Sequence, residues 1–516
     1  MGKVYVYNSG SFSEESQTGE SELKIGLFFD GTANNLYNTD ARKYVIYKDK
    51  KGLSEREKKE KERIEKEYPE KKDSEHKYTR NELKTAYDNY KDNTSYENDL
   101  TNIAKIYLKS NRKKYAIYIE GVGTGDLLKD SDLPGISHAD GEKGLLKKIR
   151  KGSEELIKVI KEHYRETKNK NLILTLDVFG FSRGATAARH FLYQVSNNKH
   201  LKVKVVSVPV GNTFTTKTIL TNVEESYLQM ALKEAGLNKL VKKINIRFVG
   251  LYDTVVSFNP VRYNIDTNFE KYVHLLHLNE IGNPMLAIHF TALDEIRKYF
   301  SLTRLSRPKA IEKNLPGAHS DVGGSYDCDQ VHSEEVILGQ NLTHLEKLDK
   351  LKQQLINEGW YSKEELKLDD NYWPKQNELI GTRNLKGEYS YLPLLWMCKY
   401  ASFLIEEEYI LFKEIKDLYK IEDDILKEVK KHLDETTFKV LSQTLEGIKS
   451  NEEIKNFIQK DNEVKEDWTF QSGVKQGLLK KLRHKYLHQS AHYGSSGPFI
   501  EPHKPNEDRK RREFPA

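Results

Sequence analysis

One stretch, residues 171–190, constrains the fold of this chain more than any other. It opens with the apolar run LILTLDV, which is typical of a buried strand. The turn GFSRG follows at 180–184, and then come the small residues ATAA, which suit a closely packed helix. A turn this tight leaves no room for side chains on its flanks, so glycine stands two residues before and two residues after the serine. The order strand, G-x-S-x-G, helix predicts a nucleophile elbow that presents the Ser182 hydroxyl above a sheet.

Strands alternate with helices through about residue 330, which predicts an α/β fold with a doubly wound, mostly parallel sheet. The predicted strands are residues 24–29, 115–119, 172–178, 203–208 and 244–249, and the predicted helices are residues 96–109, 145–163, 224–235 and 287–299. In such a sheet the chemistry collects at the carboxyl ends of the strands. Asp30, Gly121, Ser182 and Asp253 all stand at or just after such ends.

Changes in composition divide the chain into segments. We expect residues 1–22 to form an N-terminal segment and residues 23–340, which contain the elbow, to form an α/β-hydrolase-like catalytic domain. Residues 48–77 within that domain are almost entirely lysine, glutamate and arginine, and we expect a solvated helix or a mobile insertion there. Residues 341–493 show apolar residues at helical spacing and predict a mainly helical cap or accessory region packed on the core. Residues 494–516 are rich in proline, glycine and charge and predict a disordered basic tail.

Composition excludes several classes of protein. The 516 residues include 84 basic and 78 acidic side chains, a net charge of +6 on a mixed surface, so nucleic acid is not an expected partner. Cys328 and Cys398 do not form a metal-binding or disulfide pattern, so no metal or cofactor is predicted. Residues 1–20 do not resemble a signal peptide, and no apolar run approaches the roughly 18 residues of a membrane span.

An activated serine needs a base within hydrogen-bond reach, and the base needs a carboxylate to fix its tautomer. α/β-Hydrolases supply these groups in the chain order serine, acid, histidine. Asp253 fits the acid, because it follows the predicted strand INIRFV; the alternative is an aspartate that only caps a turn or helix. Asp177 lies inside the strand before the elbow, and Asp294 lies within a predicted helix, so both are weaker candidates.

His319 is the best candidate for the base. It lies in the glycine-rich loop PGAHSDVGG, whose backbone freedom lets a side chain reach across the sheet. The alternative is a loop histidine that makes only structural hydrogen bonds. Weaker candidates in apolar surroundings or without such a loop are His274, His277, His289, His488 and His492.

The negative oxygen that forms during acyl transfer needs two hydrogen-bond donors. The elbow geometry supplies the N–H of Arg183, and the loop after the first core strand, at Gly31 or Thr32, is the natural source of the second donor. The glycine-rich run at 121–125 lacks the lysine and hydroxyl residue of a phosphate-binding loop, so a nucleotide site is not expected.

Six motifs occur in the same order as in one bacterial family: FFDGTANN, YIEGVGTG, GFSRGA, GLYDTV, LPGAHSDVGGSYD and LPLLWMCKYA. They span residues 24–402. By these motifs the chain resembles a family of α/β-hydrolase-like proteins that includes the type VI secretion lipase effectors of the first class. The insertion at 48–77 and the helical segment 404–459 are not part of this motif set.

The resemblance implies an antibacterial phospholipase of A1 or A2 type that acts on a phospholipid membrane. Its nucleophile is then Ser182, its acid Asp253 and its base His319, the same residues that the chemistry indicates. It also implies synthesis in the bacterial cytoplasm, delivery by the type VI system into the periplasm of a target cell, and two partners, a spike protein and a cognate immunity protein.

The residues alone indicate a serine hydrolase that works through an acyl-enzyme, and they leave alternatives open. One is an esterase or thioesterase of a soluble acyl substrate, which would show no rise in activity when the substrate forms vesicles. The other is a non-catalytic binding module on a hydrolase scaffold. The sequence decides neither the ester bond that is cleaved nor the head group that is preferred.

Overall fold

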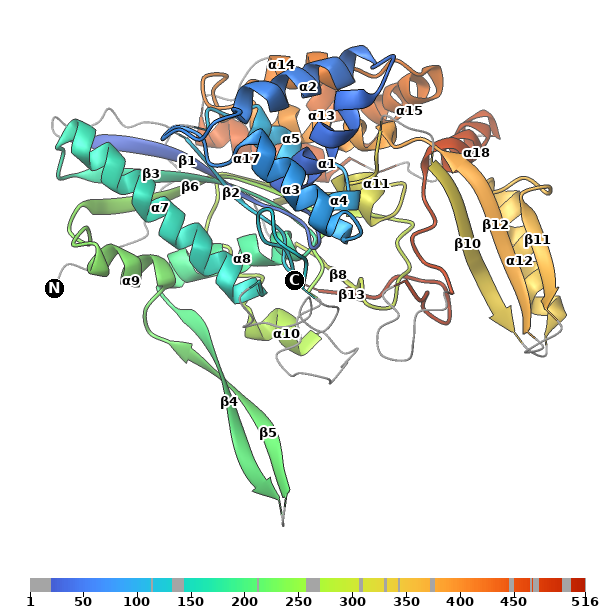
Figure 1. The fold of residues 1–516 in the computed structure, drawn as a ribbon, viewed down its shortest axis with the longest axis horizontal. Coiled ribbons are helices and arrows are strands. Elements are labelled where there is room, and N and C mark those ends of the chain that lie inside the picture. The colour runs from blue at the N-terminus through green and yellow to red at the C-terminus, as the bar shows by residue number, and fades with distance from the viewer. Residues whose placement is uncertain are drawn as a thin grey trace.

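The computed structural model describes residues 20–112, 115–131, 143–210, 213–256, 270–305, 310–328, 332–341, 344–371, 376–444, 450–464, 466, 473–493 and 503–515. A central sheet carries helices on both faces, and a long hairpin stands clear of the body (Figure 1). Most of the predicted N-terminal segment and residues 494–502 of the predicted tail lie outside the described residues.

Within the described part of the chain, six strands form the central sheet in the order β2-β1-β3-β6-β7-β9, and every neighbouring pair is parallel. The strands are β1 (Ser21–Phe29), β2 (Ala116–Ile119), β3 (Leu172–Phe181), β6 (Val241–Tyr252), β7 (Leu286–Ala292) and β9 (Ala310–Leu315). The predicted α/β fold with a mostly parallel sheet is therefore confirmed.

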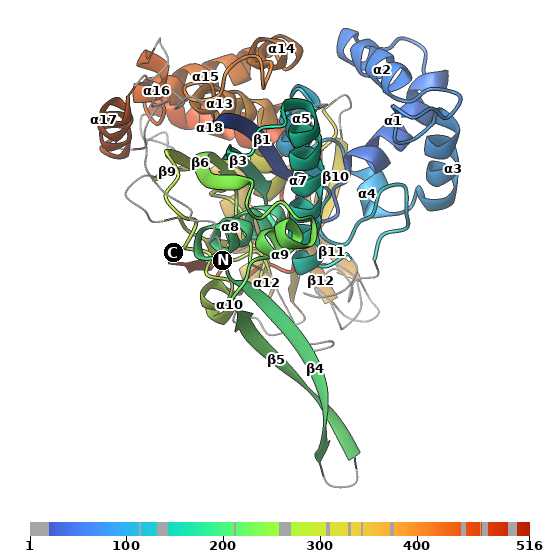
Figure 2. The same ribbon diagram turned by 90° about the vertical axis from the view of Figure 1, so that its left-hand side faces the viewer.

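Side chains that alternate along the strands fill a separate core on each face of the sheet. Phe28, Phe179 and Phe248 point to one face, which α5 (Asn102–Leu108) and α13 (Tyr391–Ala401) cover. Leu27, Val178 and Val249 point to the other face. That face carries α7 (Leu145–Thr167), α8 (Arg183–Asn197) and α9 (Tyr227–Glu234). Figure 2 shows the sheet edge-on between the two layers.

The prediction of a helix at residues 287–299 is wrong. Its first half is strand β7, LAIHFTA, in which every residue is buried. A short, continuous apolar run is compatible with a buried strand or a buried helix, because it carries no period of its own. Asp294 therefore follows the end of a strand instead of lying within a helix.

The charged insertion at 48–77 is tied to the body more firmly than its composition indicates. It contains α2 (Glu55–Glu67), which packs Ile64 into a small core shared with α1 (Leu36–Asp49), α3 (Arg80–Tyr90) and α4 (Thr94–Glu97). Arg63 donates to Asp40 from Nη2 at 2.6 Å and from Nη1 at 2.9 Å. A helix was predicted and is present, but one face of it is buried.

The region 341–493 is not purely helical. β10 (His332–Asn341), β12 (Gln376–Leu385) and β11 (Leu366–Asn371) form a small antiparallel sheet beside α12 (Leu345–Glu358). The helices that follow are α13, α14 (Phe412–Leu418), α15 (Asp424–Glu435), α16 (Lys439–Gln443), α17 (Asn451–Asn462) and α18 (Gly473–Tyr486), with the 3₁₀ turn η1 (Glu388–Ser390) before α13. Of these helices, α13 and α17 pack on strands of the central sheet, and the ring of Phe438, just before α16, lies 5.7 Å from that of Phe290 in β7.

Two further segments depart from the predictions. The strand expected at 203–208 is one arm of a hairpin, β4 (His200–Val210) and β5 (Thr213–Val223), that projects from the body in both views (Figures 1 and 2). Residues 503–515, predicted as part of a disordered tail, run back along the body, and β13 (Glu513–Phe514) pairs with β8 (Leu302–Thr303). Backbone hydrogen bonds to a distant loop hold this segment, and composition alone cannot reveal them.

The remaining short helices are α10 (Glu270–Leu275) and α11 (His319–Gly323), and α11 begins at the predicted catalytic base. In the part of the chain that the structure describes, no helix is long and apolar enough to cross a membrane.

Candidate active site

Ser182 stands at the junction between β3 and α8, in the backbone conformation of a strained turn. Its φ is 58° and its ψ is −127°, values that a residue with a side chain rarely adopts. A Cβ atom at Gly180 would lie 2.7 Å from the Cα of Ala185, and one at Gly184 would lie 2.2 Å from the carbonyl oxygen of Asp30. Both glycines are therefore required by close backbone contacts, as the predicted elbow demands.

The backbone of Ser182 is fastened to the end of β6. Its N–H donates to the carbonyl oxygen of Tyr252 at 3.0 Å, and its carbonyl accepts from Val255 N at 3.4 Å. These two residues flank Asp253 and Thr254, so the elbow and the candidate acid lie on adjacent strands. Ser182 is 2% exposed.

Asp253 and His319 are hydrogen-bonded to each other. His319 Nδ1 lies 2.5 Å from Asp253 Oδ2, and Asp253 Oδ1 accepts from the N–H of Ala292 at 2.8 Å. Because the Asp253 carboxylate accepts a hydrogen bond from the N–H at Nδ1, the lone pair that can accept a proton is on the other ring nitrogen, Nε2. The structure thus brings together two residues that the sequence pairs as acid and base.

Burial and charge set the protonation of this pair. Burial alone would raise the pKa of Asp253, but the cation of Arg511 and the hydrogen bond from His319 hold it well below its usual value. Burial lowers the pKa of His319, although its bond to Asp253 opposes that shift. Asp253 is therefore ionised and His319 neutral near neutral pH, which are the states that proton transfer from a serine needs.

Aromatic rings pack around His319. The ring of Phe181 lies 4.5 Å from the imidazole, and that of Phe300 lies 5.0 Å from it in an edge-on arrangement. A Cβ atom at Gly31 or at Gly323 would strike the ring of Phe181. The ring of Phe181, the residue before the serine, thus packs directly against the backbone of the loops at Gly31 and Gly323. Among the described residues, the Ser182 hydroxyl makes no hydrogen bond to His319, and such bonds are often long before a substrate binds.

The loop after β1 is braced by Asp30. Its Oδ1 accepts from Gly31 N at 2.7 Å and from the Thr101 hydroxyl at 2.6 Å, and its Oδ2 accepts from the Tyr118 hydroxyl at 2.5 Å. Burial raises the pKa of Asp30 to about 6 against the lowering effect of these bonds. The Gly31 N–H is already used, whereas the Thr32 hydroxyl is buried without a hydrogen-bond partner among the described residues.

Sequence analysis did not identify three charged residues at this site. Glu295 accepts from the His319 backbone N–H at 3.3 Å and forms a buried ion pair with Arg297, whose Nη2 lies 2.8 Å away. Arg511 pairs with Asp253. The first two lie in a segment predicted as helix, and the third in a segment predicted as disordered, so neither prediction placed them near the sheet edge.

The rival residues have structural partners instead. His289 accepts from Thr254 N at 3.1 Å through Nε2 and pairs with Glu312 through Nδ1 at 2.7 Å. His488 Nδ1 bonds to Asp321 at 2.8 Å. Three further rivals show the same pattern, with His277 against Glu280, Asp177 against Arg247, and Asp294 against Arg483 and Gly317. The ring of His492 stacks on that of His503 at 4.8 Å.

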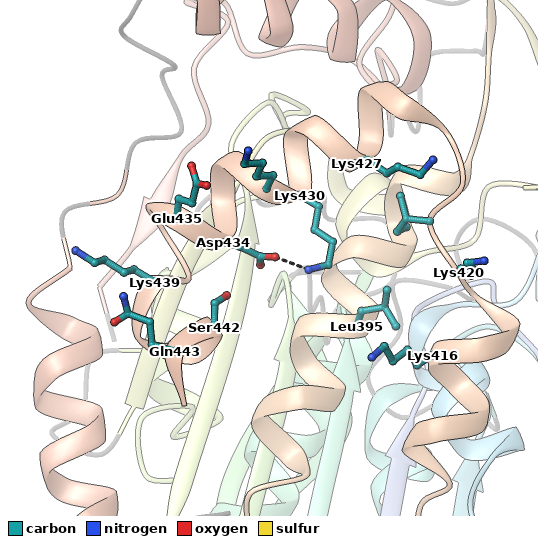
Figure 3. Close-up of a pocket in the computed structure, with 12 residues that line it drawn as sticks. Leu395, Lys416, Lys420, Lys427, Lys430, Asp434, Glu435, Lys439, Ser442 and Gln443 are labelled. Atoms are coloured by element: carbon teal, nitrogen blue, oxygen red, sulfur yellow. Dashed lines mark hydrogen bonds and ion pairs between the residues drawn. The ribbon is translucent and has the colours of Figure 1, made fainter. Parts of the chain in front are cut away.

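A basic groove lies away from this site, between α13 and α16. Its volume is about 640 Å³, and Figure 3 shows its lining. Among the described residues, it is lined by the lysines Lys416, Lys420, Lys427, Lys430, Lys431 and Lys439 and by the acids Asp434 and Glu435. Lys430 bonds to Asp434, while Lys431 points from an exposed position of α15. In the described part of the chain, no cluster of acidic, histidine or cysteine side chains has the arrangement of a metal site.

Comparison with known structures shows the same fold in one solved structure. A solved structure described as the Tle1 effector bound to the VgrG spike from the type 6 secretion system aligns over 96% of this chain and 94% of its own, with a TM-score of 0.52 and 17% identity. An uncharacterized protein from Pseudomonas aeruginosa aligns over 86% of this chain and 53% of its own, with a TM-score of 0.36 and 16% identity. No curated protein matches the chain.

A family model assigns the chain more specifically. The model described as "T6SS, Phospholipase effector Tle1-like, catalytic domain" matches residues 86–399, which is more than half of the 516 residues. Ser182, Asp253 and His319 all lie within the matched range. The chain therefore belongs to the Tle1-like phospholipase effectors of the type VI secretion system.

Proposed function

We propose that this protein is a serine phospholipase that hydrolyses acyl esters of phospholipids through Ser182, His319 and Asp253. The observation that carries the proposal is the 2.5 Å hydrogen bond between His319 and Asp253 beside a strained G-x-S-x-G turn, in a chain of a phospholipase effector family. Chemically the arrangement fits acyl transfer through a covalent intermediate.

In this mechanism the Ser182 hydroxyl attacks the ester carbonyl while His319 Nε2 takes its proton. The proton then passes to the oxygen of the departing lysophospholipid, which leaves the acyl group on Ser182. Water attacks this acyl-enzyme with His319 again as the base, and the fatty acid departs. Asp253 holds the imidazole in one tautomer and stabilises its charged form.

Two backbone amides hold the negative oxygen: that of Arg183 is the first donor, and that of Thr32 is the second. Arg183 is the first residue of α8, and the start of a helix favours negative charge through its exposed N–H groups and the helix dipole. Of the two residues that the sequence left open, Gly31 already donates to Asp30. Asp30 thus orients the loop, and Thr32 supplies the donor.

The family of the chain favours a phospholipid over a soluble ester as the substrate, and the closed state of the site fits activation at a lipid surface. Ser182 is 2% exposed and His319 is 4% exposed, so an acyl chain reaches them only after the surrounding loops move. We infer that contact with a bilayer moves these loops and opens the site. The activity therefore rises when the phospholipid forms vesicles, whereas an esterase of soluble substrates would show no such rise.

The family also suggests the biological setting. The aligned Tle1 structure is that of an effector bound to a VgrG spike. We propose that this chain is likewise loaded on a spike protein and delivered into the periplasm of a target cell, and that a cognate immunity protein protects the producing cell. Whether the cleaved ester is of A1 or A2 type is decided by positional analysis of the released fatty acids.

Fatty-acid release from mixed phospholipid vesicles tests the proposal. Ser182→Ala is expected to reduce release by about 10³-fold or more, because the nucleophile is lost. Ser153→Ala is the matched control: it removes another buried serine, whose hydroxyl bonds only within its helix to Ile149 O at 3.3 Å, and it is expected to retain full activity. Equal release from the native chain and Ser182→Ala would make Ser182 a structural turn residue and refute the mechanism.

A further inference from the structure

Residues 503–515, called the strap below, return to the catalytic edge of the sheet. The strap runs along the segment that follows β7. Asn506 N donates to Ile296 O at 2.9 Å near one end, and Leu302 N donates to Arg512 O at 2.9 Å near the other. Because backbone bonds fasten it along its length, side chains of the strap hold fixed positions at the site.

Arg511 of the strap reaches the candidate catalytic acid directly. Its Nη1 lies 2.6 Å from Asp253 Oδ1, and its Nη2 lies 2.8 Å from Asp253 Oδ2. Two further bonds fix the guanidinium, from Nε to Phe300 O at 2.9 Å and from Nη1 to Ala292 O at 3.0 Å. The Arg511 side chain is 5% exposed, so this is a buried, bidentate ion pair.

We propose that Arg511 is a positioning residue for catalysis: it holds Asp253 ionised and fixed in orientation for His319, and it thereby extends the activity of the enzyme to lower pH. The inference rests on the proposed function, because it assigns a role in the same Ser182–His319–Asp253 site.

The geometry explains why the arginine is needed. Asp253 is fully buried, and a buried carboxyl without a cation takes up a proton and stops binding an imidazolium. Arg511 supplies that cation, and its planar fork contacts both carboxylate oxygens, so the carboxylate cannot rotate away from His319 Nδ1. Lysine in the same place would supply the charge but not the fork.

The other charged groups around the pair do not replace Arg511. Glu295 accepts from the His319 backbone N–H, but Glu295 and Arg297 neutralise each other in their own ion pair. His289 lies near Asp253, but its ring nitrogens are occupied by Thr254 and Glu312.

Loss of Arg511 moves the acidic limb of the pH profile upward by two routes that act in the same direction. The buried Asp253 becomes easier to protonate. The remaining carboxylate, no longer shared with a guanidinium, also binds the protonated form of His319 more tightly, which raises the pKa of His319. Both effects place the protonated, inactive pair at a higher pH than in the native enzyme.

The test is kcat/KM for fatty-acid release from phosphatidylglycerol–phosphatidylethanolamine vesicles, measured against pH with the full chain. Arg511→Gln is expected to lose about tenfold more activity at about pH 6 than at about pH 8, relative to the native enzyme. Arg511→Lys keeps the charge and is expected to restore part of the acidic limb. Arg512→Gln removes the neighbouring, exposed arginine and is expected to keep the native profile.

A loss of the same factor at every pH, or an Arg511→Lys profile no better than that of Arg511→Gln, would overturn the inference and leave Arg511 a merely structural residue. If Arg511→Gln does not fold, the Arg511→Lys profile decides alone: an acidic limb displaced to higher pH supports the inference, and a native limb contradicts it.

A double-mutant comparison separates the inference from the function on which it rests. If Arg511 acts through Asp253, then Arg511→Gln is expected to change kcat/KM less than about twofold in an Asp253→Asn background. If the double variant instead loses kcat/KM by the product of the two single-variant factors, Arg511 does not act through Asp253. If Ser182→Ala abolishes fatty-acid release and Arg511→Gln has the native pH profile, the inference about Arg511 is wrong and the proposed function stands. If Ser182→Ala releases fatty acid at the native rate, the proposed function itself is wrong.

Discussion

Asp177 and Asp253 lie on adjacent strands of the central sheet, each in a buried bidentate pair with an arginine, yet the two pairs differ in purpose. Asp177, within β3, accepts from Arg247 Nε at 2.9 Å and from Nη2 at 2.6 Å. Burial still raises the pKa of Asp177. Asp253, at the end of β6, accepts from Arg511 and also from His319 and Ala292 N, and its pKa is lowered.

The position of a buried carboxylate along its strand decides which groups can reach it. A residue in the middle of a strand meets only its neighbours in the sheet and the helices above it. A residue at the carboxyl end of a strand is also reached by loops, which here bring a histidine and a strap arginine to one carboxylate. The first arrangement is expected to serve stability, and the second to serve chemistry.

Substitution of the acid in each of the two pairs tests this comparison, and the largest expected effect is the loss of catalysis in Asp253→Asn. Asp253→Asn is expected to reduce kcat/KM by about 10³- to 10⁴-fold, because the amide no longer stabilises the imidazolium and favours the wrong tautomer. The measurement is the initial rate of fatty-acid release from vesicles, with circular dichroism to establish folding. A folded Asp253→Asn variant with activity within tenfold of the native level would remove Asp253 from the mechanism.

The next effect is on stability. Asp177→Asn leaves Arg247 buried, with Glu406 as its one remaining ion-pair partner among the described residues, so the free energy of unfolding is expected to fall by about 3 kcal/mol. Urea unfolding measures this loss, and kcat/KM of the folded protein is expected to stay within about threefold of native. A large loss of kcat/KM with unchanged stability would break the distinction between the two pairs.

The smallest effect is expected in the basic groove, where charges are exposed and not held in buried pairs. Lys431→Gln removes one exposed lysine of the groove shown in Figure 3, and the melting temperature is expected to change by no more than about 1 °C. Differential scanning calorimetry checks this. A fall in melting temperature as large as the one that Asp177→Asn causes in the same calorimetric measurement would show that the lysines of this groove contribute to stability as the buried pairs do.

The sequence predicted the parts of the site that local pattern determines. Ser182 is marked by the glycines of its turn, Asp253 by the strand before it, and His319 by its glycine-rich loop. The parallel sheet followed from the alternation of apolar runs with amphipathic helices. In the structure Asp253 and His319 are hydrogen-bonded, while their catalytic role and that of Ser182 stay predictions that the experiments above test.

The sequence could not predict the parts that depend on distant contacts. The run LAIHFTA at β7 has no periodicity, so its strand was mistaken for a helix, and Glu295 was misplaced with it. Arg511 lies in a segment whose composition is typical of disordered chains, and contacts with residues far away in the sequence hold it in place, both the backbone bonds to residues 296–304 and the ion pair with Asp253. The proposal of Thr32 over Gly31 as the second oxyanion donor rests on the Asp30 side chain, which accepts from the Gly31 amide.

The most direct test of the central claim, that Ser182 is an activated nucleophile, is covalent labelling with an alkyl fluorophosphonate in the presence of phospholipid vesicles, followed by peptide mass analysis. The account predicts an adduct on Ser182 in the native chain, much slower labelling in Asp253→Asn, and none at this site in Ser182→Ala. A native enzyme that releases fatty acid from vesicles while Ser182 remains unmodified would contradict it.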